Sequence, residues 1–241
     1  MAQRIFIAQL QTGQTDLTAQ PARYLRDVLR LGIGDLLEAF DASGSAASAK
    51  ILAVTSGSVT LEIGPIKTAP PAAHEFTIAA AIPKGARADW MIEKITELGA
   101  AAFIPLIAAR SVSLPKGEKP QRWVRLAAEA ARQSGRAGMP RIEPLTAVTD
   151  LLNHRDPTQL AWFFSTEPGA IPIARLTAAS PPRSLLMLIG PEGGWNPDEI
   201  GRFRAAGLTG VKLTPTTLRV ETAALAAASA AALWFAGATA E

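Results

Sequence analysis

Two short segments near the end of the chain hold the residues best suited to chemistry. The first, LIGPEGGWNPDEI (188–200), places Glu192, Gly193 and Gly194 between an apolar run and the predicted start of a helix. Glycine adopts φ values that other residues avoid and carries no side chain, so a ligand can lie against the backbone of such a loop. Strand-to-helix turns also use Gly and Pro merely to turn the chain, and this segment alone leaves both interpretations open.

The same segment predicts where the helix begins. Asn196 is a favoured N-cap residue, Pro197 suits the first turn, and Glu199 stands three residues after the cap, as in a capping box. The glycines therefore lie at the carboxyl end of a strand, where open α/β sheets bind ligands. The segment lacks the glycine spacing of dinucleotide folds and the Gly-Lys-Ser or Gly-Lys-Thr of P-loops, so neither of those cofactor classes is favoured.

The second segment, LTPTTLRVETAALA (213–226), runs from a strand through Pro215 into a helix. Arg219 stands at the mouth of this loop, where an arginine is suited to binding a phosphate or stabilising an anion that develops in a reaction. Glu221, near the N-terminus of the helix, is also explained by the helix dipole, which is worth ~0.3 to 1 kcal/mol. Together the two loops predict a ligand site with a cationic rim.

Composition excludes several kinds of site. The chain has 241 residues, of which 48% are hydrophobic and 19% charged, enough to bury a core in one large or two modest domains. It has no cysteine, which excludes disulfides, thiolate metal sites and a cysteine nucleophile. His74 and His154 are the only histidines, a poor metal set, so we expect no metal. The net charge of +3 leaves an anionic partner open.

No segment predicts secretion or membrane insertion. The apolar stretch Ile5 to Leu10 is too brief for the core of a signal peptide. The segment 222–238 is mostly alanine, which gains little on entering lipid, and it is slightly short for a span. We therefore expect a buried helix there and a globular cytoplasmic protein with no membrane contact.

The distribution of apolar runs predicts two domains. Residues 1–72 read as short strands separated by Gly, Ser and Asp turns, with one helical insert at 22–31. The segment 64–75 contains three prolines and few large apolar side chains, as a linker does. We place a domain boundary near residue 72, with the second domain over 73–241.

The second domain alternates strands with helices. Its first unit is a strand over 76–82, a helix over 86–99 and a strand over 101–108. We expect Trp90, Ile92, Ile95 and Leu98 near one face of that helix. The pattern predicts six further elements along the chain: a helix over 121–134 ending at Gly135, strands over 160–165, 184–190 and 211–214, a helix from Pro197 and the C-terminal helix. This order predicts a parallel sheet covered on both faces, the α/β class.

The combination of motifs resembles one known family. IGPEGG, a helix and then LxxxxLRxETA at the end of the chain are similar to the SPOUT class of methyltransferases. Within that class the chain resembles the ribosomal small subunit methyltransferase E family, whose other blocks match 83–112, 122–142 and YLRDVLRLGIGD (24–35). The resemblance covers essentially the whole chain.

The resemblance implies both a fold and an activity. The fold is a small PUA-like β-barrel that binds RNA, followed by a SPOUT domain whose C-terminal part forms a deep trefoil knot. The activity is methylation of N3 of a uridine in 16S ribosomal RNA, near the decoding region of an assembled small subunit, by a homodimer that uses S-adenosylmethionine. The walls of the cofactor site are implied to be Phe164, Ser165, Thr166, Ile189, Gly190, Pro191, Glu192, Gly193, Gly194, Leu213, Thr214, Pro215 and Leu218.

Catalytic roles are implied for the second loop. Arg219 is our candidate for stabilising the uridine as charge develops on N3. Glu221 is expected to orient Arg219 or accept the proton, and Glu192 to orient the loop or face the cationic cofactor. A capping or bracing role explains either glutamate equally well.

Candidate RNA contacts lie mainly on the helix over 121–134. Arg125, Glu129, Arg132 and Arg136 form a stripe if that helix extends one turn further, although such stripes are more often solvated faces. The resemblance favours RNA contacts at Arg132, Gln133 and Arg136, with Lys84 and Arg87 as further candidates. Such contacts set affinity and its salt dependence without choosing the base.

Two positions depart from the family pattern, and two other functions stay open. Thr214 stands where relatives often have Gly, which adds a side chain and removes a permissive φ. Tyr24 stands where many relatives carry a histidine. The alternatives are another SPOUT activity, such as 2′-O-methylation of RNA, and an RNA-binding or ribosome-assembly protein that has lost the chemistry. Cofactor binding and the identity of the modified nucleoside separate these hypotheses.

Overall fold

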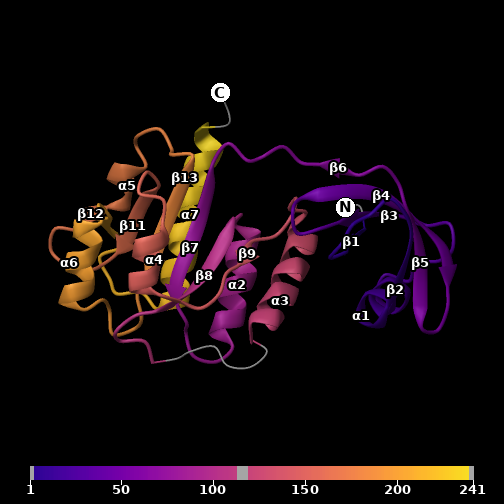
Figure 1. Cartoon of the computed structure of the whole chain (residues 1–241), viewed down its shortest axis with the longest axis horizontal. Helices are drawn as coiled ribbons and strands as arrows, with labels where there is room; N and C mark the ends of the chain where they lie inside the picture. The colour runs from indigo at the N-terminus through magenta and orange to yellow at the C-terminus, as the bar shows by residue number, and fades with distance from the viewer. Residues whose placement is uncertain (1–2, 113–118, 239–241) are drawn as a thin grey trace. The chain divides into compact units, whose positions relative to one another are not determined.

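The protein consists of two compact units in a computed structural model that describes residues 3–112 and 119–238 (Figure 1). The first unit comprises Met1–Pro71 together with Ala128–Met139. The second comprises Ala72–Ala127 and Pro140–Glu241.

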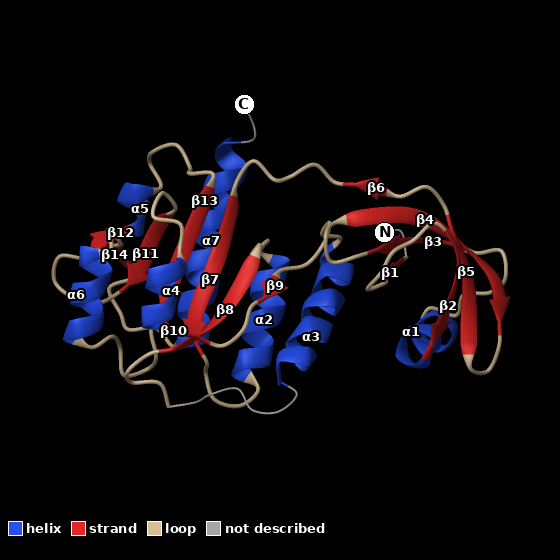
Figure 2. Ribbon diagram, viewed as in Figure 1, coloured by secondary structure: helices blue, strands red, loops and turns tan. Residues whose placement is uncertain are grey.

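The first unit is built on a mostly antiparallel sheet (Figure 2). Its strand order is β1-β3-β4-β5-β2, with β6 paired to β4, and β1 and β3 run parallel. Alternate residues of β5 are buried, as the two-residue period of a strand with one core face requires. The strands are β1 (Arg4–Phe6), β2 (Gly13–Thr18), β3 (Leu36–Phe40), β4 (Ser45–Val54), β5 (Ser58–Ile63) and β6 (Lys67–Thr68).

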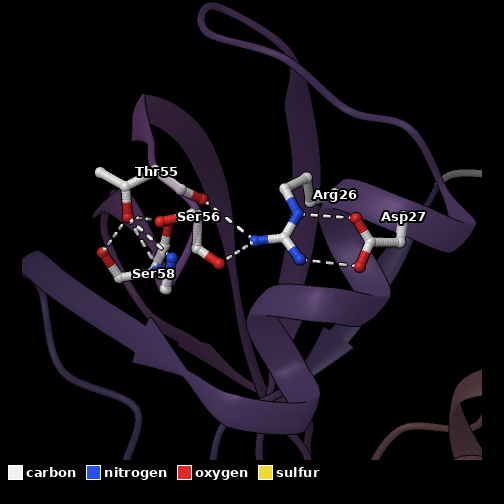
Figure 3. A network of polar contacts seen from close by, with 6 residues as sticks. Arg26, Asp27, Thr55, Ser56 and Ser58 are labelled. Atoms are coloured by element: carbon white, nitrogen blue, oxygen red, sulfur yellow. Dashed lines mark hydrogen bonds and ion pairs between the residues drawn. The ribbon is translucent and has the colours of Figure 1, made fainter.

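The helical insert of this unit begins and ends earlier than predicted. It consists of α1 (Ala19–Arg23) and a π-helical turn, η1 (Tyr24–Val28), and it buries Leu25 in the core. Arg26 fixes the insert, because its guanidinium donates to the carboxylate of Asp27 at 2.6 and 2.7 Å and to backbone carbonyls of the β4–β5 turn (Figure 3). Its hydrogen bond to Asp27 holds the pKa of that carboxyl below its usual value.

The second unit is built on a parallel sheet, as predicted. Its strand order is β10-β8-β7-β13-β11-β14-β12, with β9 paired to β8, and every pairing between described strands is parallel. The strands are β7 (Glu75–Ala81), β8 (Ala102–Ile107), β9 (Arg141–Ile142), β10 (Thr146–Ala147), β11 (Leu160–Phe164), β12 (Ile171–Pro172), β13 (Ser184–Ile189) and β14 (Thr209–Lys212).

Helices cover both faces of this sheet (Figure 2). Consecutive residues of a strand point to opposite faces, and β11 shows this directly. Trp162 stacks on Trp234 of α7 with ring centroids 5.6 Å apart, whereas Phe163 contacts Phe203 of α6 at 5.0 Å. The helices are α2 (Arg87–Glu97), α3 (Lys119–Ser134), α4 (Val148–His154), α5 (Ile173–Leu176), α6 (Pro197–Ala205) and α7 (Val220–Ala238).

Two predictions about helices are corrected or refined by the packing. On α2 the buried face includes Met91, Ile92 and Ile95, whereas Trp90 is 45% exposed, so its assignment to the apolar face was wrong. Helix α7 is long and apolar enough to cross a membrane by length and composition alone. Its packing on β7, β13 and α2 buries 44% of that apolar window, so the helix that was expected to be buried is only partly buried.

Candidate functional site

Three loops at the carboxyl ends of β11, β13 and β14 line one pocket of about 300 Å³. The three strands are parallel neighbours, so their carboxyl ends meet at the same edge of the sheet. The predicted cofactor residues other than Pro215 all line this pocket. Thr216 and Thr217, within the predicted wall segment 213–218, also line it, and residues that were not predicted complete the wall: Arg110, Glu167, Trp195, Ile200 and Ala223.

Trp195 joins two of these loops. Its indole Nε1 donates to the carbonyl of Phe164 at 3.0 Å, and its ring lies against Gly190. A Cβ at Gly190 would lie 2.9 Å from Cε2 of Trp195, which is too close for any other residue. Gly190 is therefore required for space, and the packed indole fixes the glycine-rich elbow to the loop after β11.

The two following glycines serve different purposes. Gly194 has φ +69°, in the left-handed region, and its N–H donates to the carbonyl of Pro191 at 2.8 Å to close the turn. Gly193 does not have a positive φ, so of these two glycines only Gly194 uses a conformation that other residues avoid. A Cβ at Gly193 would instead lie 3.3 Å from Cβ and Cδ of Arg110, so this glycine admits a close approach.

The predicted start of α6 is confirmed. The side chain of Asn196 accepts from the N–H of Glu199 at 2.7 Å, and the Glu199 carboxylate accepts from the N–H of Asn196 at 2.9 Å. The other carboxylate oxygen of Glu199 accepts from the N–H of Ala109 at 2.8 Å. This buried side chain thereby connects the elbow and α6 to the turn that follows β8.

Arg110, in that turn, reaches the pocket. Its Nη1 donates to the carbonyl of Gly193 at 2.7 Å and lies 3.5 Å from the carbonyl oxygen of Trp195. The side chain is exposed and lines the pocket at the same time. The guanidinium therefore stands at the mouth of the pocket, held by the elbow.

The third wall accommodates the threonine that departs from the family pattern. Thr214 lines the pocket with a φ outside the left-handed region, so it needs no glycine-like backbone in this chain. Its Oγ1 donates to the carbonyl of Thr216 at 2.8 Å, which holds the loop in a local turn.

The two candidate catalytic residues lie apart from the pocket wall. Arg219 is exposed immediately before α7 and is not among the described residues that line the pocket. Glu221 is buried, and its Oε1 lies 3.7 Å from Nε of Arg87, whereas its Oε2 has no hydrogen-bond partner within the described chain. In the part of the chain that the structure describes, Glu221 pairs with Arg87 and not with Arg219.

The candidate RNA contacts fall into two groups. In the first unit, Arg132 lies 4.4 Å from the ring centroid of Tyr24 and binds the Glu129 carboxylate, which also accepts from Gln133 at 3.1 Å. In the second unit, Lys84 is exposed in the turn before α2, and Arg87 is exposed as the first residue of that helix.

The predicted charged stripe does not extend to Arg136. Helix α3 ends at Ser134, and Gly135 with φ +73° turns the chain out of the helix. Burial lowers the pKa of the Arg136 guanidinium to about 10, which leaves it protonated at neutral pH. Its backbone carbonyl accepts from Arg4 at 2.9 Å, so this segment helps to hold the first unit together.

Two families of domains match the chain. The RNA methyltransferase domain matches residues 70–232, and the RNA methyltransferase PUA domain matches residues 17–64. Ribosomal RNA small subunit methyltransferase E of Bacillus subtilis is 33% identical, and the match spans 95% of each chain. The protein of that name in Synechocystis is also 33% identical, over 92% of this chain and 75% of the relative.

Solved structures with bound cofactor share the fold. A ribosomal RNA small subunit methyltransferase E from Neisseria gonorrhoeae, bound to S-adenosyl methionine, is 27% identical and superposes with a TM-score of 0.84 over 95% of this chain and 96% of that one. A putative methyltransferase from Legionella pneumophila in complex with the same cofactor is 25% identical, with a TM-score of 0.85 over 98% of both chains.

Proposed function

The chain belongs to the ribosomal RNA small subunit methyltransferase E family, and we propose that it methylates N3 of a uridine in 16S ribosomal RNA. The observation that carries this proposal is the pocket at the carboxyl ends of β11, β13 and β14. S-adenosylmethionine supplies the methyl group in this reaction.

The residues of the pocket fit that cofactor. Ile189, Leu213 and Leu218 offer apolar surface for an adenine ring, and the glycine elbow exposes backbone groups where a Cβ would intrude. The carboxylates of Glu167 and Glu192 line the same pocket and complement a sulfonium cation. These side chains would hold the cofactor mainly by shape and backbone hydrogen bonds.

Methyl transfer to uridine N3 is an in-line displacement, in which the N3–carbon bond forms as the carbon–sulfur bond breaks. The enzyme must orient the base and favour loss of the N3 proton, and orientation alone contributes several kcal/mol, ~7 to 11 at the most. A cation beside the uracil lowers the barrier by stabilising charge as the proton leaves to water. An arginine in the site therefore replaces a strong base.

We propose that Arg219 and Glu221 serve this step in different ways. Arg219, exposed before α7, contacts the uridine or the nucleotide next to it. Glu221 does not line the pocket, so its role is to position other groups and not to accept the proton. It acts through Arg87, its partner at 3.7 Å, which would anchor the start of α2 and α7 near the bound RNA.

The N-terminal unit is proposed to hold the substrate. A PUA-type domain beside Arg132, Gln133 and Arg136 would bind ribosomal RNA near the decoding region of an assembled small subunit in the cytoplasm. Lys84 and Arg87 would contribute phosphate contacts from the second unit. Such contacts make RNA binding weaken as the salt concentration rises. The slope of the logarithm of the binding constant against the logarithm of salt concentration falls by about one for each phosphate that is neutralised.

Two further features of the active protein are proposals. The order β13-β11-β14 and the return of α7 to β7 and α2 support a C-terminal segment that threads through a loop as a deep trefoil knot. A homodimer is supported by the exposed face of α7, where Leu233 is 75% exposed in an apolar helix that buries only 44% of its apolar window. Leu233→Glu should lower the mass measured by light scattering from dimer to monomer.

The test of the activity is methyl transfer to purified ribosomal particles. The protein is incubated with radiolabelled S-adenosylmethionine and small subunits that lack the modification, and label in RNA is measured. We expect label in 16S RNA, and much less with Gly190→Val, whose side chain would displace Trp195 from the pocket. Absence of label with a protein that still binds small subunits would favour the non-catalytic RNA-binding hypothesis.

A further inference from the structure

Arg110 differs from every other charged residue of the pocket. Among the described residues that line it, the charged side chains are Arg110, Glu167 and Glu192, so Arg110 supplies the cation. Two carboxylates would repel an anionic base, whereas a guanidinium would attract it. Among the described residues of the pocket, Arg110 thus carries the positive charge that would stabilise the anionic uracil during methylation of N3.

The backbone that carries Arg110 is fixed at the end of β8. The N–H of Ala108 donates to Oγ of Ser111 at 2.9 Å, and the N–H of Ala109 donates to the buried Glu199 at 2.8 Å. These bonds hold the residues on both sides of Arg110. A short turn held in this way places the guanidinium with little loss of entropy when substrate arrives.

The side chain is also positioned at its charged end. Nη1 donates to the carbonyl of Gly193 at 2.7 Å, and the aliphatic part packs against Gly193, where a Cβ would come within 3.3 Å. A guanidinium has five N–H donors in a planar fork. The hydrogen bonds found among the described residues use Nη1, which leaves donors on the same plane for a ligand at the pocket mouth.

Uracil presents a matching set of acceptors. Its N3 lies between the carbonyl oxygens O2 and O4, and the charge left by the N3 proton spreads onto both. We propose that Arg110 is a catalytic residue that donates to one of these oxygens and stabilises the uridine anion during methylation, with the proton passing to water. This inference rests on the proposed function. It identifies Arg110 as the cation inside the pocket that stabilises the uridine anion, in addition to Arg219, which lies outside the pocket.

Two substitutions separate charge from the contact with Gly193. Arg110→Gln keeps the carbon atoms that pack against Gly193 but removes the cation, whereas Arg110→Lys keeps the cation on a flexible side chain. We expect kcat at saturating S-adenosylmethionine to fall about 100-fold in Arg110→Gln and less in Arg110→Lys. Arg202→Gln, at an exposed arginine of α6 outside the pocket, is the matched control and should leave kcat unchanged.

Two readouts distinguish catalysis from a structural role. The Kd for S-adenosylmethionine, measured by calorimetry, should stay within about threefold of wild type in Arg110→Gln, a difference below 1 kcal/mol. The rate of this variant should rise more steeply with pH than that of wild type, because solution ionisation of N3 replaces the missing cation. An Arg110→Gln protein with weakened cofactor binding and unchanged kcat would overturn the proposal, since Arg110 would then only support the elbow.

Other outcomes are equally decisive. A raised KM for small subunits with a reduced salt dependence and normal kcat would make Arg110 a phosphate contact and contradict the proposal. If wild-type protein labels a ribose or no nucleoside at all, the proposed function itself fails. This outcome is seen in the wild type, so it is distinguishable from a loss of kcat that is confined to a variant. Label in 3-methyluridine by wild type, with a kcat that falls in Arg110→Gln but not in Arg202→Gln, supports both.

Discussion

Replacing Gly190 by alanine tests how the pocket is built. A Cβ at this position would meet the indole of Trp195 at 2.9 Å from Cε2, 3.1 Å from Cδ2 and 3.2 Å from Nε1. Real side chains do not approach so closely, so the buried indole must move. Its hydrogen bond to the carbonyl of Phe164, 3.0 Å long, would be lost or distorted.

The expected cost follows from these two effects. Overpacking a close-packed interior by one methyl group costs about 1 to 3 kcal/mol. The lost hydrogen bond adds about 0.5 to 1.5 kcal/mol. We therefore expect Gly190→Ala to lower the free energy of unfolding by about 1.5 to 4.5 kcal/mol and to weaken S-adenosylmethionine binding, because the elbow and the loop after β11 share this contact.

The assay is urea unfolding of Gly190→Ala, with the same substitution at a second glycine as the matched control. Gly201, in α6, has nothing within 4 Å of the position that a Cβ would take, so Gly201→Ala should be neutral or stabilising by up to about 1 kcal/mol. Fluorescence reports unfolding, and calorimetry reports cofactor affinity. If Gly190→Ala unfolds at the wild-type urea concentration and binds the cofactor normally, the close packing of Gly190 and Trp195 does not shape this site.

Three smaller perturbations test other parts of the account. Asn196→Ala removes the cap of α6 and should cost about 1 kcal/mol of unfolding free energy, measured by urea titration. Trp195→Phe keeps an aromatic ring, smaller than the indole, but leaves the carbonyl of Phe164 without its donor, so thermal unfolding should show a loss of at least about 1 kcal/mol and calorimetry weaker binding of the cofactor. The hydrogen bond from Arg132 lowers the pKa of Glu129, so the pair stabilises the fold above the ordinary pKa of a glutamate and less as pH falls. Glu129→Gln should therefore cost less than about 1 kcal/mol at pH 7, since the Glu129 side chain is 49% exposed and solvent screens the pair, and the difference from wild type should shrink near pH 3 in urea titrations.

Much of the second unit was predictable because its signals are local. Apolar runs separated by helical patterns gave the parallel sheet, and the side chain of Asn196 with its partner Glu199 marked the first residue of α6 correctly. Short elements were missed for the same reason. The two-residue strands β9, β10 and β12 are defined by pairing with neighbours, which a single sequence does not display.

The pocket was predictable only in part. The loops were found from glycine and proline patterns, but Trp195 and Arg110 became visible only through tertiary contacts. Arg110 follows β8, and its hydrogen bond to Gly193 joins residues 83 positions apart in the sequence, a separation that no local pattern reveals. The partner of Glu221 was missed likewise, because Arg87 lies at the start of another helix.

The position of the transferred methyl group is the most direct test of the central claim. Small subunits are methylated with S-adenosylmethionine that carries a deuterated methyl group, the RNA is digested, and the labelled nucleoside is fragmented in a mass spectrometer. We predict that the label stays with the uracil base and that the nucleoside coelutes with 3-methyluridine. A label that leaves with the ribose would contradict methylation at N3 and point to 2′-O-methylation instead.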